Sequence, residues 1–246
     1  MNIEFEPLQS EPAYRRVAAA LLNRIVDRTL SPGDRLPPEL ELARQFAVNR
    51  STVREAMREL ESAGMLRRQR GSKRMMVSRP ERHSVAGGVS RALALHGVSI
   101  RDVWEGLSVL EPPIAEAAAR CRGAADLRAI EQIVAASMPR AAAAATLQAA
   151  DFFRRVGEAS HNRVLMLAHE PLLQLLEPSL RIIIDEVAVA RGRIAAAQRR
   201  ILDAIRAGDG AVARQWTAKH IRDFRRGFDL AGIDLACAVE TGAARP

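Results

Sequence analysis

A helical spacing of apolar residues runs from residue 99 to about residue 231 and restricts the fold more than any other feature of this chain. A strand would alternate apolar and polar residues, and almost none of this stretch does so. Pro, Gly and Asn interrupt the spacing at intervals of about one helix length, which predicts six or seven helices packed as a bundle. We therefore expect a mainly α protein in which this segment is an all-helical domain.

The first helix of this bundle has a recognisable start. Ser99 stands where an N-cap is expected, and Asp102 follows three residues later in the pattern of a capping box. Pro112 and Pro113 lie inside the same apolar pattern, and we expect them to kink the helix because proline donates no backbone hydrogen bond.

The first 78 residues predict a different domain. Apolar residues between positions 17 and 26 recur at helical spacing, and the run SPGDRLP (31–37) ends this helix. A second short helix is expected in PELELARQFAV (38–48), and a third begins near Arg50. In MLRRQRGSKRMMVS (65–78) a glycine-centred turn separates two short runs that can pair as a hairpin. Three helices and a small hairpin predict a winged helix-turn-helix.

Composition also suggests where the domains meet. Residues 79–98 combine Pro, a Gly pair and mixed charge, which predicts a linker, so the helical domain is expected to span 99–231. Residues 232–246 are predicted to form a C-terminal tail.

Basic charge is concentrated in the first third of the chain. The formal net charge is +8, and residues 1–80 contain 15 Lys and Arg against 10 Asp and Glu, which favours a polyanionic partner. The two cysteines are far apart and lack metal-ligand spacing, and no segment approaches about 18 consecutive apolar residues. We expect a cytoplasmic protein that does not enter a membrane.

The third helix combines a core stripe with a basic start. The residues expected to be buried are Val53, Ala56, Met57, Leu60 and Ala63. Off this stripe, neither Arg50 nor Arg54 has an acidic residue three or four positions away within the helix, which argues against a surface laced by ion pairs. Backbone N–H groups at a helix start bind phosphate, and arginine binds phosphate or guanine edges. The wing adds basic residues at Arg67, Arg68, Arg70, Lys73 and Arg74. We predict that this helix binds DNA in the major groove.

The stretch SPGDRLPPELELARQFAVNRSTVREAMRELESAGMLRRQRG (31–71) resembles the GntR family of bacterial transcription regulators, and the resemblance extends over about residues 11–77. It implies DNA contacts from the recognition helix and a wing tip at Arg70 and Gly71. The full set of DNA-binding residues that we predict is Arg35, Asn49, Arg50, Ser51, Thr52, Arg54, Arg70, Gly71, Lys73 and Arg74.

The helical domain resembles the FCD effector domain of the FadR-type subgroup through IRDVWEGLSVLEPPIAEAAARC (100–121), FFRRVGEASHN (152–162) and ILDAIRAGDGAVARQWTAKHI (201–221). Many members of this subgroup bind a metal through one Asp and three His, and the metal then holds a carboxylate ligand. Here the four positions hold Ala149, Phe153, Gln198 and His220, and Asp151 lies about 200° around the helix from the expected face. We therefore expect no metal cofactor.

The same resemblance suggests where an effector binds. Several relatives carry an Arg where this chain has Leu107, which implies a ligand less polar than a carboxylate, or a pocket kept only for packing. The effector-binding residues that we predict are Trp104, Leu107, Ala149, Phe153, Gln198, Trp216 and His220. Gln198 and His220 lie on apolar stripes, so a buried structural hydrogen bond is the alternative role for each. The other histidines, including His169, are expected to be incidental.

These features predict a transcriptional regulator that acts as a homodimer on a pseudo-palindromic operator, with repression relieved by a small organic effector. The alternative is an architectural DNA-binding protein in which the helical domain only dimerises. An enzyme is not expected, because Glu158, His161 and Glu170 form no recognisable nucleophile–base pair and no phosphate-binding loop is present.

Overall fold

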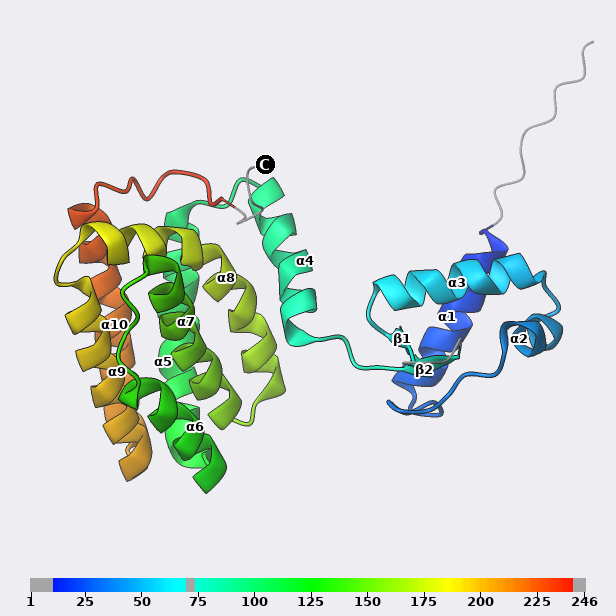
Figure 1. Ribbon diagram of the computed structural model, residues 1–246, viewed down its shortest axis with the longest axis horizontal. Coiled ribbons are helices and arrows are strands. Elements are labelled where there is room, and N and C mark those ends of the chain that lie inside the picture. The colour runs from blue at the N-terminus through cyan, green and yellow to red at the C-terminus, as the bar shows by residue number, and fades with distance from the viewer. Residues whose placement is uncertain (1–10, 70–73, 241–246) are drawn as a thin grey trace, which may run out of the picture. The chain divides into compact units, whose positions relative to one another are not determined.

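The computed structural model describes residues 11–69 and 74–240, and it divides into one unit that ends at Ser84 and a second that begins at Val85. The first unit contains helices α1 (Ala13–Val26), α2 (Glu39–Phe46) and α3 (Arg50–Ser62), followed by strands β1 (Leu66–Arg68) and β2 (Met75–Val77). The strands pair antiparallel, with Leu66 opposite Val77 (Figure 1). This arrangement confirms the predicted winged helix-turn-helix.

The core of the first unit joins all three helices to the hairpin. Val53, Ala56, Met57 and Leu60 of α3 are buried, as the stripe predicts, and they pack with residues of α1, α2 and both strands. Ala63 was also expected in this stripe but is exposed, because the helix ends there as its C-cap. The predicted stripe is therefore one residue too long.

The SPGDRLP run does more than end a helix. The Gly33 N–H donates to the Val77 carbonyl at 2.9 Å, and the Leu36 N–H donates to the Met75 carbonyl at 2.9 Å. This segment therefore lies along β2 as an additional edge, and Leu36 contributes to the core. Sequence reading missed this pairing, because a Pro- and Gly-rich run shows no strand alternation.

The second unit contains seven helices in the described residues (Figure 1). Their bounds are α4 (Arg82–Leu95), α5 (Ile100–Cys121), α6 (Ala124–Ala135), α7 (Ala142–Ala159), α8 (Arg163–Glu186), α9 (Ala190–Ala207) and α10 (Gly210–Leu230). Helix α5 packs against α7, α8, α9 and α10 and so forms the centre of the bundle. Small residues such as Ala118, Ala119 and Ala213 are fully buried, and they let the helix backbones approach closely.

The start of α5 confirms the predicted capping box. The Asp102 N–H donates to Ser99 Oγ at 3.2 Å, and the Ser99 N–H donates to Asp102 Oδ2 at 2.8 Å. The helix continues through Pro112 and Pro113 to Cys121 as one element. Both prolines are packed inside or against the bundle, which holds α5 in place where two backbone donors are missing.

Most of the stretch predicted as a linker, residues 79–98, is helical instead. Helix α4 occupies residues 82–95, and its buried Ser90 places its hydroxyl 3.2 Å from the Pro171 carbonyl of α8. Ala86 is buried on the same face. The Gly pair and the proline suggested a linker with the domain boundary in it, and the boundary between the units does fall inside this stretch, after Ser84. Packing on the bundle compensates for the low helix propensity of glycine.

The segment after α10 also folds back. The Ile100 N–H donates to the Cys237 carbonyl at 3.0 Å, the Val239 N–H donates to the Val98 carbonyl at 2.9 Å, and Leu235 is buried. Of the predicted tail 232–246, the described part therefore belongs to the bundle. It covers the backbone donors at the start of α5, which a helix leaves without partners of its own.

Candidate functional site

The start of α3 presents the predicted basic and hydroxyl groups. Asn49 is the N-cap in extended conformation, and its side chain makes no capping hydrogen bond. Arg50, Ser51 and Arg54 are exposed, and Thr52 is half-buried. The first N–H groups of the helix and these side chains therefore face the same region, which is the arrangement that binds phosphate.

The two arginines are paired, and this corrects the expectation that they have no acidic neighbour. Glu39 from the first turn of α2 accepts from Arg50 Nε at 2.8 Å and from Arg54 Nη2 at 3.1 Å. The Arg54 and Arg50 guanidinium groups together hold the pKa of Glu39 below its usual value. The search along one helix missed Glu39, because the helix-turn-helix brings it to α3 from eleven residues before Arg50.

These ion pairs still leave both arginines able to bind DNA. The side chains of Arg50 and Arg54 remain 61% and 45% exposed, and two guanidinium groups against one carboxylate leave a surplus positive charge. Exposed ion pairs stabilise a protein by only about 0–1 kcal/mol, so a phosphate or a guanine edge can compete for either arginine. Glu39 therefore orients the two side chains without neutralising the surface.

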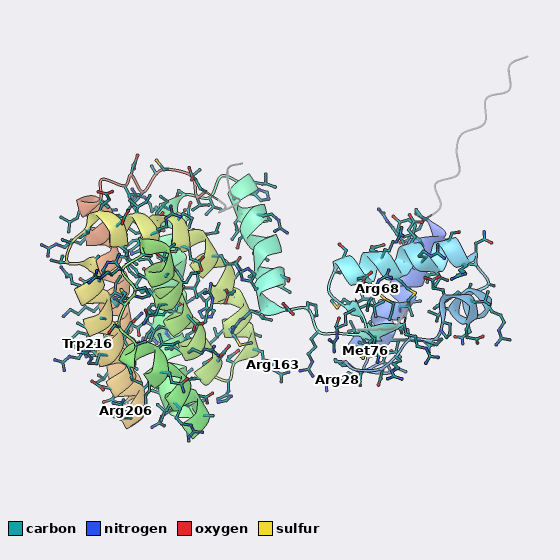
Figure 2. The ribbon with its side chains drawn as sticks, viewed as in Figure 1. Arg28, Arg68, Met76, Arg163, Arg206 and Trp216 are labelled. Atoms are coloured by element: carbon teal, nitrogen blue, oxygen red, sulfur yellow. The ribbon has the colours of Figure 1, made fainter. Side chains whose placement is uncertain are left out.

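The hairpin places further cations near the winged unit's surface. Arg67 and Arg68 on β1 are exposed, and Arg68 Nε lies 3.2 Å from Glu61 Oε1 of α3 (Figure 2). Arg35 is exposed and forms a bridge with Met76 of β2. Arg74 is exposed directly before β2. The predicted wing-tip residues Arg70, Gly71 and Lys73 lie outside the described residues.

In the helical unit, four of the predicted effector residues come together at one cavity. Leu107, Ala149, Phe153 and His220 line it with acidic Glu111 and Glu177. The remaining lining is apolar: Ala150, Leu173, Leu176, Leu180, Ile221 and Phe224. The cavity is narrow and lies between α5, α7, α8 and α10.

The other three predicted effector residues lie elsewhere. The Trp104 indole donates to the Ile221 carbonyl at 2.8 Å, so its role is to tie α5 to α10. Gln198 is buried, and its amide donates to the Ala149 carbonyl at 3.4 Å, which is the structural role weighed as the alternative. Trp216 is half-buried on α10, where the Lys219 ammonium lies 4.6 Å from its ring centroid (Figure 2).

Of the four positions where the FCD resemblance places metal ligands, only His220 keeps the residue type that the resemblance implies. The Phe153 ring stacks on the His220 imidazole with centroids 5.6 Å apart and planes 7° from parallel, so a hydrocarbon occupies the place of a ligand. Asp151 is exposed and lies near Arg155 rather than in the cavity. Within residues 11–69 and 74–240, no three His, Cys, Asp or Glu side chains are grouped as a metal site requires. Burial also lowers the pKa of His220 to about 4, so its ring is neutral at physiological pH.

A second hollow lies on the other side of His220. It is formed by the end of α8, the start of α9 and α10, and His220 and Phe224 line both hollows. Its polar residues besides His220 are Arg193, Asp223 and Arg226, and Arg193 Nη2 lies 3.2 Å from Asp223 Oδ2.

Sequence reading missed a buried polar pair beside the first cavity. His169 Nδ1 lies 2.9 Å from Glu111 Oε1, and neither side chain is exposed. Gly157 makes room for the imidazole, because a Cβ at that position would lie 2.7 Å from His169 Cε1 and Nε2. His169 is therefore not incidental, and the glycine inside an otherwise helical run of α7 was the available clue.

A partly buried ion-pair network includes Glu170, the residue after His169. Arg154 of α7 donates to Glu170 at 2.8 Å and to Glu177 at 2.7 Å, both on α8. Glu170, considered above as part of a possible enzyme site, is thus engaged in holding two helices together. No described helix combines the length and the apolar character that crossing a membrane requires.

Two parts of the chain match known families. Residues 13–73 match the family described as "Bacterial regulatory proteins, gntR family", and residues 102–223 match the FCD domain. The first match covers most of the winged unit, and the second covers most of helices α5 to α10.

Several known proteins are similar to this chain over most of its length. The HTH-type transcriptional regulator LutR of Bacillus subtilis (strain 168) is 28% identical over 198 residues, which cover 78% of this chain and 90% of that protein. The uncharacterized HTH-type transcriptional regulator Rv0494 of Mycobacterium tuberculosis is 29% identical over 67% of this chain and 69% of its own length. A solved structure titled "Streptococcus agalactiae GntR" has a TM-score of 0.61 and 26% identity, over 87% of this chain and 99% of that one. Each similarity is long enough to extend over both units.

Proposed function

The chain belongs to the GntR family of bacterial transcriptional regulators and carries an FCD domain, and we therefore propose a separate binding role for each of its two units. The winged unit binds DNA, and the helical unit binds a small-molecule effector. We propose that the active form is a homodimer whose two recognition helices read the halves of a pseudo-palindromic operator. It works in the cytoplasm, where its DNA target lies.

The observation that carries the DNA-binding proposal is the pair of exposed arginines at the start of α3. Glu39 orients Arg50 and Arg54, and the helix N-terminus beside them attracts phosphate. With Asn49, Ser51 and Thr52 they form the group that we propose to contact base edges and phosphates. Arg35 and the basic hairpin add contacts with the flanking backbone.

Effector control follows from two arrangements of the dimer with unequal affinity for the operator. An effector that binds one arrangement more tightly shifts the population toward it, by no more than its difference in affinity. We propose that the unliganded dimer represses and that the effector releases it. We further propose that no metal takes part, since Phe153 stacks where a ligand is needed; stoichiometric zinc that survives dialysis of the purified chain would contradict this.

Footprinting and titration of operator fragments test the DNA-binding proposal. Arg50→Ala and Arg54→Ala should each lose roughly 1–3 kcal/mol of operator affinity, whereas Arg128→Ala in the helical unit serves as a control with the same charge change and no expected loss. Unchanged operator affinity in both α3 variants would remove this helix from recognition. Protection of every duplex without a discrete site would favour an architectural protein instead.

A further inference from the structure

The polar groups that line the first cavity are acidic or neutral. Glu111, Glu177 and His220 contribute all of them, and the described lining contains no Lys or Arg. Leu107 forms the wall one helical turn before Glu111. A carboxylate ligand would therefore meet no cation there, although burying a charge without a partner is strongly unfavourable.

Two buried atoms of this lining have no hydrogen-bond partner within the described chain. Glu111 is not exposed at all, and while its Oε1 lies 2.9 Å from His169 Nδ1, its Oε2 has no partner. His220 is 4% exposed, and its Nε2 also has no partner. Buried polar groups are normally satisfied, so atoms such as these indicate a place for an absent hydrogen-bonding group. Both belong to residues of the same cavity.

The charges around the cavity favour a cation. Three carboxylates, Glu111, Glu170 and Glu177, lie on facing helices, and Arg154 pairs with the latter two. His169 Nδ1 lies 2.9 Å from Glu111 Oε1. An ammonium group beside Glu111 would pair with a buried carboxylate to which the described lining supplies no Lys or Arg, in a medium where charge interactions are strong.

We infer that the effector is a small primary amine whose ammonium group donates to Glu111 Oε2 and whose apolar part enters by displacing the side chains of Phe153, Leu176 and Phe224, because the cavity of about 10 Å³ has room for only about one water-sized group as it stands. This inference rests on the proposed function, because it takes the cavity to be the effector site. His220 Nε2, which also has no partner within the described chain, offers a second polar contact to the same ligand.

Three probes that share a benzyl or phenyl skeleton test the charge preference on the unmodified chain. Benzylamine, benzyl alcohol and benzoate would each be titrated at millimolar concentration, with binding followed by ligand-observed NMR and by thermal unfolding. We expect benzylamine to bind and to raise the melting temperature, and benzoate to do neither. Stabilisation by benzoate in preference to benzylamine would overturn the inference and would direct attention to Arg193 and Arg226 in the second hollow. Binding of none of the probes would also overturn it and would favour a cavity kept for packing.

Two matched substitutions on α5 test whether Glu111 is the residue that binds the ammonium group. Glu111→Gln keeps the shape and the hydrogen bond with His169 but removes the charge, and it should weaken benzylamine binding roughly ten- to hundredfold, the equivalent of one charge-assisted hydrogen bond. Glu105→Gln makes the same change on the exposed face of the helix and should leave binding unchanged. Equal binding by the wild type and a folded Glu111→Gln variant would exclude Glu111 as the anchor. The comparison of probes on the wild type decides the question even where a variant does not fold.

Operator binding, measured separately, distinguishes this inference from the proposed function. A chain that binds its operator but prefers no amine remains a regulator with another ligand. A chain that binds benzylamine but no promoter fragment would retain the ligand assignment and lose the regulatory role.

Discussion

A single carboxylate at residue 39 organises the surface that we propose to bind DNA. Glu39 holds Arg50 and Arg54 in place before any duplex arrives, which reduces the conformational entropy that these long side chains lose on binding. The same carboxylate repels nearby phosphates. Its removal should therefore affect specific and non-specific binding in opposite directions.

Glu39→Gln is expected to lower the ratio of operator to non-operator affinity by roughly three- to thirtyfold, since two arginines must then be ordered during binding. Affinity for non-operator duplex should rise slightly, because a negative charge is lost beside the backbone. Fluorescence anisotropy with both duplexes at fixed salt measures the ratio. Glu41→Gln, which affects only the pairing with Arg44 and Gln45, is the control. An equal fall of the affinity ratio in both variants would contradict the role assigned to Glu39.

His220 makes the stability of the helical unit depend on pH. Burial lowers its folded-state pKa to about 4, while the unfolded chain binds the proton near pH 6.5. Between these values the unfolded state carries more protons, so the free energy of unfolding falls as pH decreases from 6.5 to 4, by up to about 3 kcal/mol.

His220→Phe should remove this contribution, because a phenyl ring in the same place between Phe153 and Phe224 carries no proton. Urea unfolding at pH 7 and at pH 4.5 measures the difference. His96→Gln, at an exposed position, should leave the pH dependence as it is in the wild type. The same pH dependence in His220→Phe as in the wild type would assign the effect to other groups.

At the level of helices, α7 and α8 are held together by polar groups rather than by hydrocarbon alone. Gly157 allows the α8 imidazole of His169 to approach the α7 backbone, and Arg154 bridges to two carboxylates of α8. Glycine lowers helix propensity by about 1 kcal/mol relative to alanine. Here that cost is offset, because only glycine lets the His169 ring come this close to the α7 backbone.

Gly157→Ala should consequently destabilise the protein by roughly 1–3 kcal/mol, since the new Cβ would lie 2.7 Å from a ring with no room to move. Gly88→Ala in α4 has nothing within 4 Å of the added carbon and should stabilise by about 0.5–1 kcal/mol. Thermal and urea unfolding of the two variants measure whether the same substitution lowers stability at one position and raises it at the other. Stabilisation by both would show that α8 can shift at His169 to accommodate the added Cβ.

On the scale of the whole molecule, the chain has two cores with no shared residue. One cluster joins α1 to α3 with the hairpin, and the other joins α5 to α10 with the segment that follows. A core of its own lets each unit unfold as a cooperative element.

Leu60→Ala and Ile114→Ala probe this division, since each residue is buried in one of the cores. Each should destabilise its own unit by about 2–5 kcal/mol and leave the melting of the other unchanged. Differential scanning calorimetry follows both transitions. A shift of both transitions in either variant would mean that the units unfold as one.

Local patterns were sufficient to predict most of the helices and the hairpin. The helical spacing, the Ser99–Asp102 box and the α3 stripe predicted these elements because each depends on residues within a few positions of one another. The linker prediction was wrong over α4, because the docking of Ser90 on α8 is a long-range contact. Gln198 was predicted at the effector cavity because it stands where the family resemblance places a metal ligand, but its amide donates to the Ala149 carbonyl, and the Trp104 indole donates to the Ile221 carbonyl.

The sequence by itself determined most of the helices, the winged motif and the basic start of α3, since short-range spacing and charge specify them. Only the tertiary structure decided that Glu39 pairs with Arg50 and Arg54, that Phe153 stacks on His220, and that Glu111 meets His169 inside the bundle. These partners lie 11 to 67 positions apart in the chain. The physical reason is that a side chain's partner and burial depend on how the helices pack, and no local spacing encodes that packing.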